Sequence, residues 1–477
     1  MTVKSQERHS AIYMMGRIIP AAVNLASTAI FTRLAAPESY STYVLAYATA
    51  QIGSALLFQW LRQGLLRFSS SAPRQDVIGT IGALYSGQAL LTIALTAVAW
   101  AISDMQDPTI LLLCGALTLG QAWFDLAQEL QRADMQSKRY GILFLARSAS
   151  GLILGTIALV MTDSGFWLTF GVLLSFIAPP FPFIWRHLGN GRLNTALLSE
   201  VVRYSWPLMI STSLATAAMV GDRLLVAALL SPEEAGQYGP AVDIARQSIF
   251  VFVQGIALAG YPMAIRALES GDRKGAEEQL RKNVELLLLV SAPATLGLIA
   301  VSDSVAALLL GSEYQESAKL LLPISAVASF FMCLRTFYFD QAMQLGKKTG
   351  AQVVVSAAII IVFLGSAYLL IPMFGMMGAA AALLFSQASG LVISYSVGRS
   401  YFELPFPMGS ALKILVASSG MFAVLTAVKS LLPGSGPAIL VPLVLTGVTI
   451  YGLLIFLFDV LSVKEILLKK FTTWRNK

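Results

Sequence analysis

Residues 350–371 read GAQVVVSAAIIIVFLGSAYLLI, residues 375–398 read GMMGAAAALLFSQASGLVISYSVG, and neither run contains a charged side chain. Each run is long enough to cross a bilayer as a helix, which takes about 20 apolar residues. In hydrocarbon every backbone N–H and C=O needs a partner, and a helix supplies these partners within its own segment. A membrane barrel would show strands of about ten alternating residues instead. The two runs therefore predict two transmembrane helices.

The same pattern recurs along the whole chain of 477 residues, of which 56% are hydrophobic and only 12% are charged. Soluble domains carry about 25% charged residues, so this composition excludes a soluble protein. We predict an all-α polytopic membrane protein with fourteen transmembrane helices, the first of which is retained and not cleaved as a signal peptide. The predicted spans are 11–34, 40–61, 77–102, 109–131, 141–162, 164–185, 205–230, 237–264, 284–310, 318–345, 350–371, 375–398, 411–431 and 436–460.

The Lys and Arg residues indicate the orientation of these spans. With a cytoplasmic N-terminus, 27 of the 33 fall on the inner side, three lie within spans, and only Arg33, Lys319 and Lys429 fall outside. Cytoplasmic loops are enriched in Lys and Arg, so both termini are expected on the cytoplasmic side of the cytoplasmic (inner) membrane. The same distribution explains the formal net charge of +7, because positive charge gathers beside anionic headgroups. Nucleic acid is not expected as a partner.

Two short motifs occur twice, at equivalent places in two six-helix halves. PESYSTY begins at Pro37 and PEEAGQY at Pro232, an offset of 195, while MQSKRYG at Met135 returns as MQLGKKTG at Met343. Because six is even, the halves cross the membrane in the same sense and are expected to be related by a pseudo-two-fold axis along the membrane normal. The predicted organisation is an N-terminal six-helix lobe (1–190), a cytoplasmic interfacial linker helix (191–204), a C-terminal six-helix lobe (205–400), and two additional helices with a basic cytoplasmic tail (401–477).

Ionised side chains within the spans are the candidate functional residues. Each costs about 2.5–3.5 kcal/mol at mid-bilayer and persists only where it faces partners or water. Since a guanidinium matches phosphate oxygens, the candidates for binding an anionic substrate are Arg17, Arg147, Arg223, Arg246 and Arg335. Since a carboxylate away from water binds a proton more strongly, the candidates for ion coupling are Asp125, Glu129, Asp222, Asp243 and Asp340.

These candidates also have structural interpretations. Asp243 and Arg246 are spaced i,i+3 on one helix face, and residues 222–223 lie at similar depth on the preceding helix, so the four can form salt bridges that hold two helices together. Arg17 and Arg147 can extend their guanidinium groups to the inner headgroups. Aromatic side chains in the spans can stack on sugar rings or simply pack within the bundle.

The stretch from Asp222 to Ile265, DRLLVAALLSPEEAGQYGPAVDIARQSIFVFVQGIALAGYPMAI, resembles the seventh and eighth helices of MOP-superfamily polysaccharide flippases, the Wzx-type exporters of lipid-linked oligosaccharides. IPMFGMMGAAAALLFSQ from Ile371 is similar to the family's outer turn between helices eleven and twelve. The resemblance implies an alternating-access carrier with two lobes and an often cationic cavity. Its substrate would be an undecaprenyl-diphosphate-linked glycan for exopolysaccharide, O-antigen or capsule biosynthesis. Membrane lipids, H⁺ or Na⁺ as coupling ion, and a glycan polymerase are the implied partners.

Neither a metal site nor a cofactor is expected. Cys114 and Cys333 lie in apolar segments, and the chain has only two histidines. The GxxxxGK[ST] loop of an ATP-driven pump is missing, and outer loops of about ten residues or fewer leave no room for an enzyme site such as that of a glycan polymerase. Two other carriers remain as alternatives. One is a multidrug cation antiporter of the same superfamily, for which Asp125 and Glu129 argue, and the other is a peptidoglycan precursor flippase.

Overall fold

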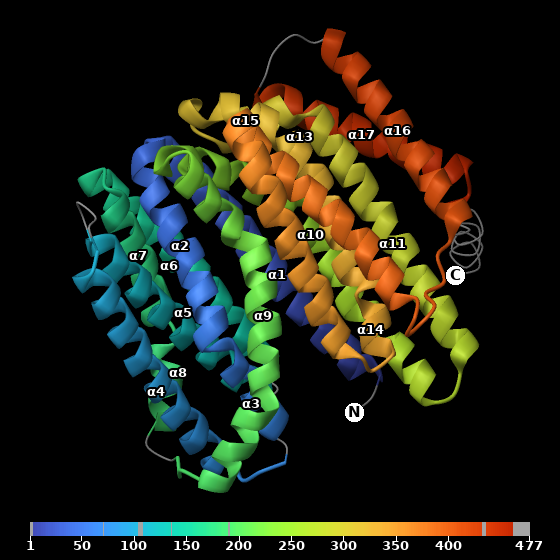
Figure 1. Ribbon diagram of the computed structural model, residues 1–477. Helices are drawn as coiled ribbons and strands as arrows, with labels where there is room; N and C mark the ends of the chain where they lie inside the picture. Colours follow the sequence, from blue (N-terminus) through green and yellow to red (C-terminus); the bar gives the residue numbers. More distant parts are fainter. Residues whose placement is uncertain are drawn as a thin grey trace, which may run out of the picture. The chain divides into compact units, whose positions relative to one another are not determined.

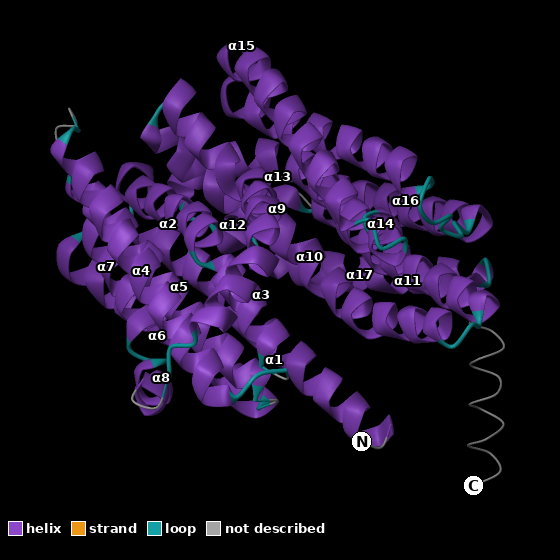
Figure 2. Cartoon of the chain, turned by 60° about the horizontal axis from the view of Figure 1, so that its bottom comes forward, coloured by secondary structure: helices purple, strands orange, loops and turns teal. Residues whose placement is uncertain are grey.

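The computed structural model describes residues 3–69, 71–103, 108–134, 136–188, 191–431 and 436–460. All regular secondary structure in these residues is helical, and Figure 2 shows long helices joined by short loops. The predicted all-α class is confirmed for this part of the chain.

The first of two compact units comprises Met1–Pro240 and Ser356–Ala379. Its helices, labelled in Figure 1, are α1 Val3–Leu34, α2 Pro37–Leu57, α3 Gln59–Phe68, α4 Arg74–Ala101, α5 Thr109–Ala133, α6 Ser137–Thr162, α7 Gly165–Ile177, α8 Phe181–Leu188, α9 Thr195–Leu229, the start of α10 Pro232–Glu269 and the middle of α15 Thr349–Gly398. Helix α2 packs against α5, α7 and α9, and α6 packs against α1 and α7. Helices α2 and α5, which pack against each other and against α3 and α7, therefore lie among the other helices of this unit.

The second compact unit comprises Ala241–Val355 and Ala380–Lys477. After the rest of α10 it contains α11 Arg273–Ala300, α12 Ser302–Leu309, α13 Ser312–Leu334, the π-helical turn η1 Arg335–Phe339, α14 Gln341–Leu345, both ends of α15 Thr349–Gly398, α16 Met408–Leu431 and α17 Pro437–Leu457. Helix α11 packs against α13 and α16, and α16 packs against α17.

Eleven of the described helices are long and apolar enough to cross a membrane, and a bent pair brings the number to as many as twelve. The chain is thus a multi-pass membrane protein. The bent pair is α2 and α3, which meet at an angle of 43° on either side of Phe58. The predicted span 40–61 falls on this bent pair, and three other predicted spans are also divided: 164–185 between α7 and α8, 284–310 between α11 and α12, and 318–345 between α13, η1 and α14.

The segment expected to form a separate linker helix, 191–204, is continuous with the next span. Residues 195–204 are the first turns of α9. The helix begins here because the Asn194 side chain accepts hydrogen bonds from the N–H groups of Ala196 and Leu197 at 3.1 and 3.2 Å, which satisfies two of the unpaired donors of a helix N-terminus. The basic tail over 461–477 lies outside the described residues.

Helix α15 consists of two helices joined at Gly375, whose φ of 57° and ψ of −139° interrupt the helical geometry. A residue with a Cβ avoids this conformation. A Cβ on Gly378 would overlap the carbonyl oxygen of Leu370, although eight residues of straight helix span about 12 Å. The chain therefore turns sharply between the predicted spans 350–371 and 375–398.

This turn gives a stability prediction. Gly375→Ala should lower the free energy of unfolding by about 1–3 kcal/mol, since alanine would be strained at positive φ. Gly365→Ala is the matched control on the same element, because a Cβ there would meet open space. Thermal unfolding of the detergent-solubilised variants measures both effects, and equal stability of the two variants would contradict the turn.

Candidate functional site

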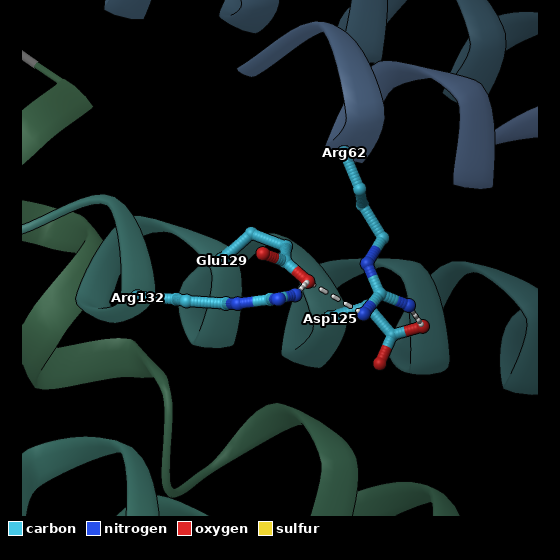
Figure 3. Close-up of polar contacts among 4 residues, drawn as sticks. All are labelled: Arg62, Asp125, Glu129 and Arg132. Carbon is cyan, nitrogen blue, oxygen red and sulfur yellow. Dashed lines mark hydrogen bonds and ion pairs between the residues drawn. The ribbon is translucent and has the colours of Figure 1, made fainter. Parts of the chain in front are cut away.

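An ion cluster lies where α3 packs against α5 (Figure 3). Arg62 donates from Nη1 to Asp125 Oδ2 at 2.9 Å and from Nη2 to Glu129 Oε1 at 2.9 Å. The two carboxylates are one helical turn apart on α5, so one planar guanidinium reaches both. Arg132 approaches the same Glu129 oxygen at 3.6 Å. Two of the predicted ion-coupling acids are thus bonded to an arginine that the sequence interpretation counted only as an inner-side residue.

Apolar packing holds this cluster in place. Trp60, Leu61 and Leu65 of α3 are buried in one hydrophobic cluster with Leu126 and Leu130 of α5. Because α3 begins after the bend at Phe58, its apolar face lies on α5 while Arg62 reaches Asp125 and Glu129. The sequence signal for Arg62 is the pair of acids at i and i+4 on α5, because two neighbouring carboxylates in a membrane helix need a cation to neutralise them.

Arg147 on α6 is the second feature of the first unit, and it is buried, with 8% of its surface exposed. Its guanidinium carbon lies 4.0 Å from the centroid of the Phe176 ring, and Nη2 donates to the Tyr47 hydroxyl at 3.3 Å. Within the described residues no carboxylate forms an ion pair with Arg147, and its Nε has no hydrogen-bond partner. The guanidinium is therefore a buried cation held by aromatic side chains.

Asp222 and Arg223 are both buried in the first unit, with 2% and 4% of their surfaces exposed. The Asp222 carboxylate accepts hydrogen bonds from the Tyr238 hydroxyl at 3.2 Å and from the Arg223 backbone N–H at 3.0 Å. Asp222 consequently ties α9 to the first turns of α10.

In the second unit Arg335 and Asp340 form an ion pair across η1, with 2.8 Å between Nη1 and Oδ2. Residues five apart point about 140° away from each other in an α-helix, whereas a π-turn closes i to i+5 and aligns them. The backbone shows this closure, since the Asp340 N–H donates to the Arg335 carbonyl at 2.9 Å. The Ser394 hydroxyl donates to the other Asp340 oxygen at 2.6 Å. The sequence pattern predicted one continuous helix over 318–345 and did not predict the π-turn.

The remaining candidates are Asp243, Arg246 and Arg17. Asp243 and Arg246 lie one turn apart on the part of α10 that belongs to the second unit, and Arg246 is buried. The side chain of Arg17 lies outside the described residues. Over the described ranges, no three His, Cys, Asp or Glu side chains come together in a way that could hold a metal ion.

The fold is that of the MOP-superfamily transporters. It is similar to a structure described as the lipid II flippase MurJ in an inward closed conformation, with 13% identity, a TM-score of 0.76, and coverage of 94% of this chain and 99% of that one. It is also similar to a multidrug resistance MATE family transporter of the MOP superfamily in inward-facing form (11% identity, TM-score 0.59, 82% and 97% covered). An outward-facing structure with the same description is similar as well (14% identity, TM-score 0.55, 82% and 94% covered).

The model of a family described as polysaccharide biosynthesis protein matches residues 30–319, more than half of the chain. The chain belongs to this family, which confirms the resemblance to polysaccharide biosynthesis proteins noted in the sequence. No curated protein matches the chain.

The ion cluster of Figure 3 gives the second prediction. Arg62→Ala should lower the free energy of unfolding by about 3 kcal/mol, because it leaves the Asp125 carboxylate without its cation and Glu129 with only the more distant Arg132. Arg132→Ala is the matched control and should cost less than about 1 kcal/mol, since 54% of the Arg132 side chain is exposed. Thermal unfolding in detergent compares them, and an Arg62 variant as stable as the Arg132 variant would refute the role of the cluster.

Proposed function

We propose that this protein moves undecaprenyl-diphosphate-linked glycan units across the cytoplasmic membrane by alternating access, in exopolysaccharide, O-antigen or capsule biosynthesis. Family membership supports the pathway, and the likeness to inward- and outward-facing transporters supports a two-state carrier. The observation that supports an anionic substrate is the environment of Arg147, a buried cation that forms no ion pair with a carboxylate among the described residues.

The proposed architecture is fourteen spans in two six-helix lobes and two additional helices, with both termini in the cytoplasm. The helix set supports this number. The eleven apolar helices include α15 as one helix, although it turns at Gly375, and do not include the 32-residue α1. With the bent pair as one more span, the second arm of α15 as another and α1 as another, the eleven become fourteen. The distribution of Lys and Arg supports the orientation.

An anionic diphosphate fits the environment of Arg147. Among the described residues Arg147 forms no ion pair, although the Asp125 carboxylate lies near enough to interact with it electrostatically. A guanidinium without an ion pair is costly in a poorly solvated interior, and an anion would offset that cost. The Nε of Arg147 has no partner in the described structure, so it is available to donate a hydrogen bond. A phosphate takes two parallel hydrogen bonds from one guanidinium, and such charge-assisted bonds are the strong ones. Because Arg147 is covered in this conformation, the substrate would reach it in another state of the cycle.

The acids of the first unit argue against a multidrug cation antiporter. Such a carrier needs carboxylates free to attract an organic cation, and Asp125 and Glu129 each accept a hydrogen bond from Arg62. The peptidoglycan precursor flippase differs from our proposal only in the glycan, and a panel of lipid-linked substrates separates the two. The coupling ion, H⁺ or Na⁺, is tested by imposing each gradient on the same vesicles.

The third prediction concerns Arg147. In proteoliposomes, Arg147→Gln should slow the flipping of an undecaprenyl-diphosphate-linked oligosaccharide by about 10-fold or more, since a hydrogen bond to a charged group contributes about 1.5–3 kcal/mol. Arg147→Lys should recover part of the rate, because it restores the charge but not the planar fork. Exposed Arg132→Gln serves as the control. Flipping by Arg147→Gln at the parental rate would remove Arg147 from the substrate site.

A fourth prediction covers the other two arginines and the antiporter. Arg246→Ala and Arg335→Ala should impair flipping at unchanged expression, because Arg246 is buried and only 13% of the Arg335 side chain is exposed, so each removes a guanidinium largely shielded from solvent. Cells producing the parent protein should not export a cationic dye faster than cells without it. Normal glycan flipping in both variants would discard these two assignments, and rapid dye export would favour the antiporter.

A further inference from the structure

The two copies of the outer-loop motif contact each other within the first unit. A Cβ on Gly236 would lie 3.1 Å from the Cβ of Ser41, and a Cβ on Gly239 would lie 3.0 Å from Cγ1 of Val44. The offset between the motifs, 195 residues, relates position 41 to 236 and position 44 to 239. Each residue therefore contacts its own counterpart in the other copy.

Such self-matched contacts have a specific geometric meaning. When two segments are related by a two-fold axis, a residue can contact its own equivalent only if both lie directly beside that axis, one on each side. Two successive self-matched pairs, one helical turn apart, place the crossing of α2 and α10 on the pseudo-two-fold axis proposed for the lobes. The contacts come from the structure and the offset comes from the sequence, so the agreement joins two independent observations.

The crossing is closed in this structure. A Cβ on Gly236 would overlap the carbonyl oxygen of Pro37, so the backbone of α10 rests directly on the first turn of α2. The side chains around the crossing are buried, with 4% of Tyr40, 4% of Val44 and 0% of Tyr238 exposed. A side chain at position 236 would hold the two helices apart.

We propose that the crossing of α2 and α10 is the outer gate of the carrier, and that the glycines of α10 allow it to shut. This inference rests on the proposed function and orientation, in which the loops before α2 and α10 face outward. Helix α2 belongs to the proposed lobe 1–190 and α10 to the lobe 205–400. When the lobes rock to open the cavity outward, two helices that meet on the axis must separate.

A disulfide across the crossing tests the gate. The parent for this test carries Cys114→Ala and Cys333→Ala, and the gate variant adds Val44→Cys and Gly239→Cys. The position-239 Cβ would lie 3.0 Å from Val44 Cγ1, whose place the sulfur of the Val44→Cys variant would take, and this spacing suits a disulfide. In membranes without substrate, oxidation should form the bond in most molecules. It should slow glycan flipping at least 10-fold, and a reductant should restore the rate.

The matched control joins α2 to α5 inside one proposed lobe. With Gly53→Cys and Thr118→Cys, the position-53 Cβ lies 3.1 Å from Thr118 Oγ1 and 3.8 Å from Thr118 Cβ, so the geometry is equivalent. This pair should cross-link and leave flipping unchanged. Failure of the 44–239 pair to cross-link where the control does, or full flipping in its cross-linked form, overturns the gate.

A second readout does not depend on transport, so the gate can be judged even if the parent flips no glycan and the proposed function fails. A single Val44→Cys reports whether the crossing is open, through its labelling by a membrane-impermeant thiol reagent added outside. Adding Gly236→Val should raise the labelling rate several-fold, and the milder Gly236→Ala should raise it less. Gly221→Val is the control, since a Cβ on Gly221 would meet open space. Labelling that Gly236→Val and Gly236→Ala leave unchanged contradicts the proposal.

Discussion

The low polarity of the bilayer interior is the constraint on which this structure depends. An ionised group there persists only with a partner or water, so each charge fixes the position of what surrounds it. Arg62 holds α3 on α5 through two carboxylates, and Arg335 requires a π-turn to face Asp340. Arg147 is the exception within the described residues, because the Phe176 ring and the Tyr47 hydroxyl contact its guanidinium and no carboxylate forms an ion pair with it. Arg62 and Arg335 each form ion pairs, whereas the Arg147 guanidinium does not, so Arg147 is suited to receiving an anion.

Glycine residues allow a second kind of contact, in which helix backbones touch directly. Helices that carry no side chain at a crossing approach one another more closely, and glycine makes this approach possible at Gly236 and Gly378. At Gly378 the close approach belongs to a fixed turn inside α15, whereas at Gly236 it joins two helices that come from different proposed lobes. A glycine at such a contact lets the two backbones close directly on one another, which suits a surface that must shut.

Much of the fold could be predicted from the sequence, because hydrophobic length and the Lys and Arg distribution act locally along the chain. The turn at Gly375 falls where one predicted span ends and the next begins, whereas the contact between the repeated motifs at residues 41 and 236 was not predicted. The site was harder to predict. Asp125 and Glu129 were recognised, but Arg62 was not, since its role depends on a bend at Phe58 and on packing between segments 63 residues apart. The π-turn at Arg335 likewise follows from tertiary partners such as Ser394.

The central claim is that Arg147 receives the charged head of a lipid-linked glycan. An experimental structure of the protein bound to an undecaprenyl-diphosphate-linked oligosaccharide tests it most directly. Our account predicts phosphate oxygens within about 3 Å of the Arg147 guanidinium, which is hydrogen-bonding distance. It also predicts that the guanidinium has turned from Tyr47 towards the phosphates. A diphosphate bound elsewhere, with Arg147 still covered over Phe176, would contradict the account.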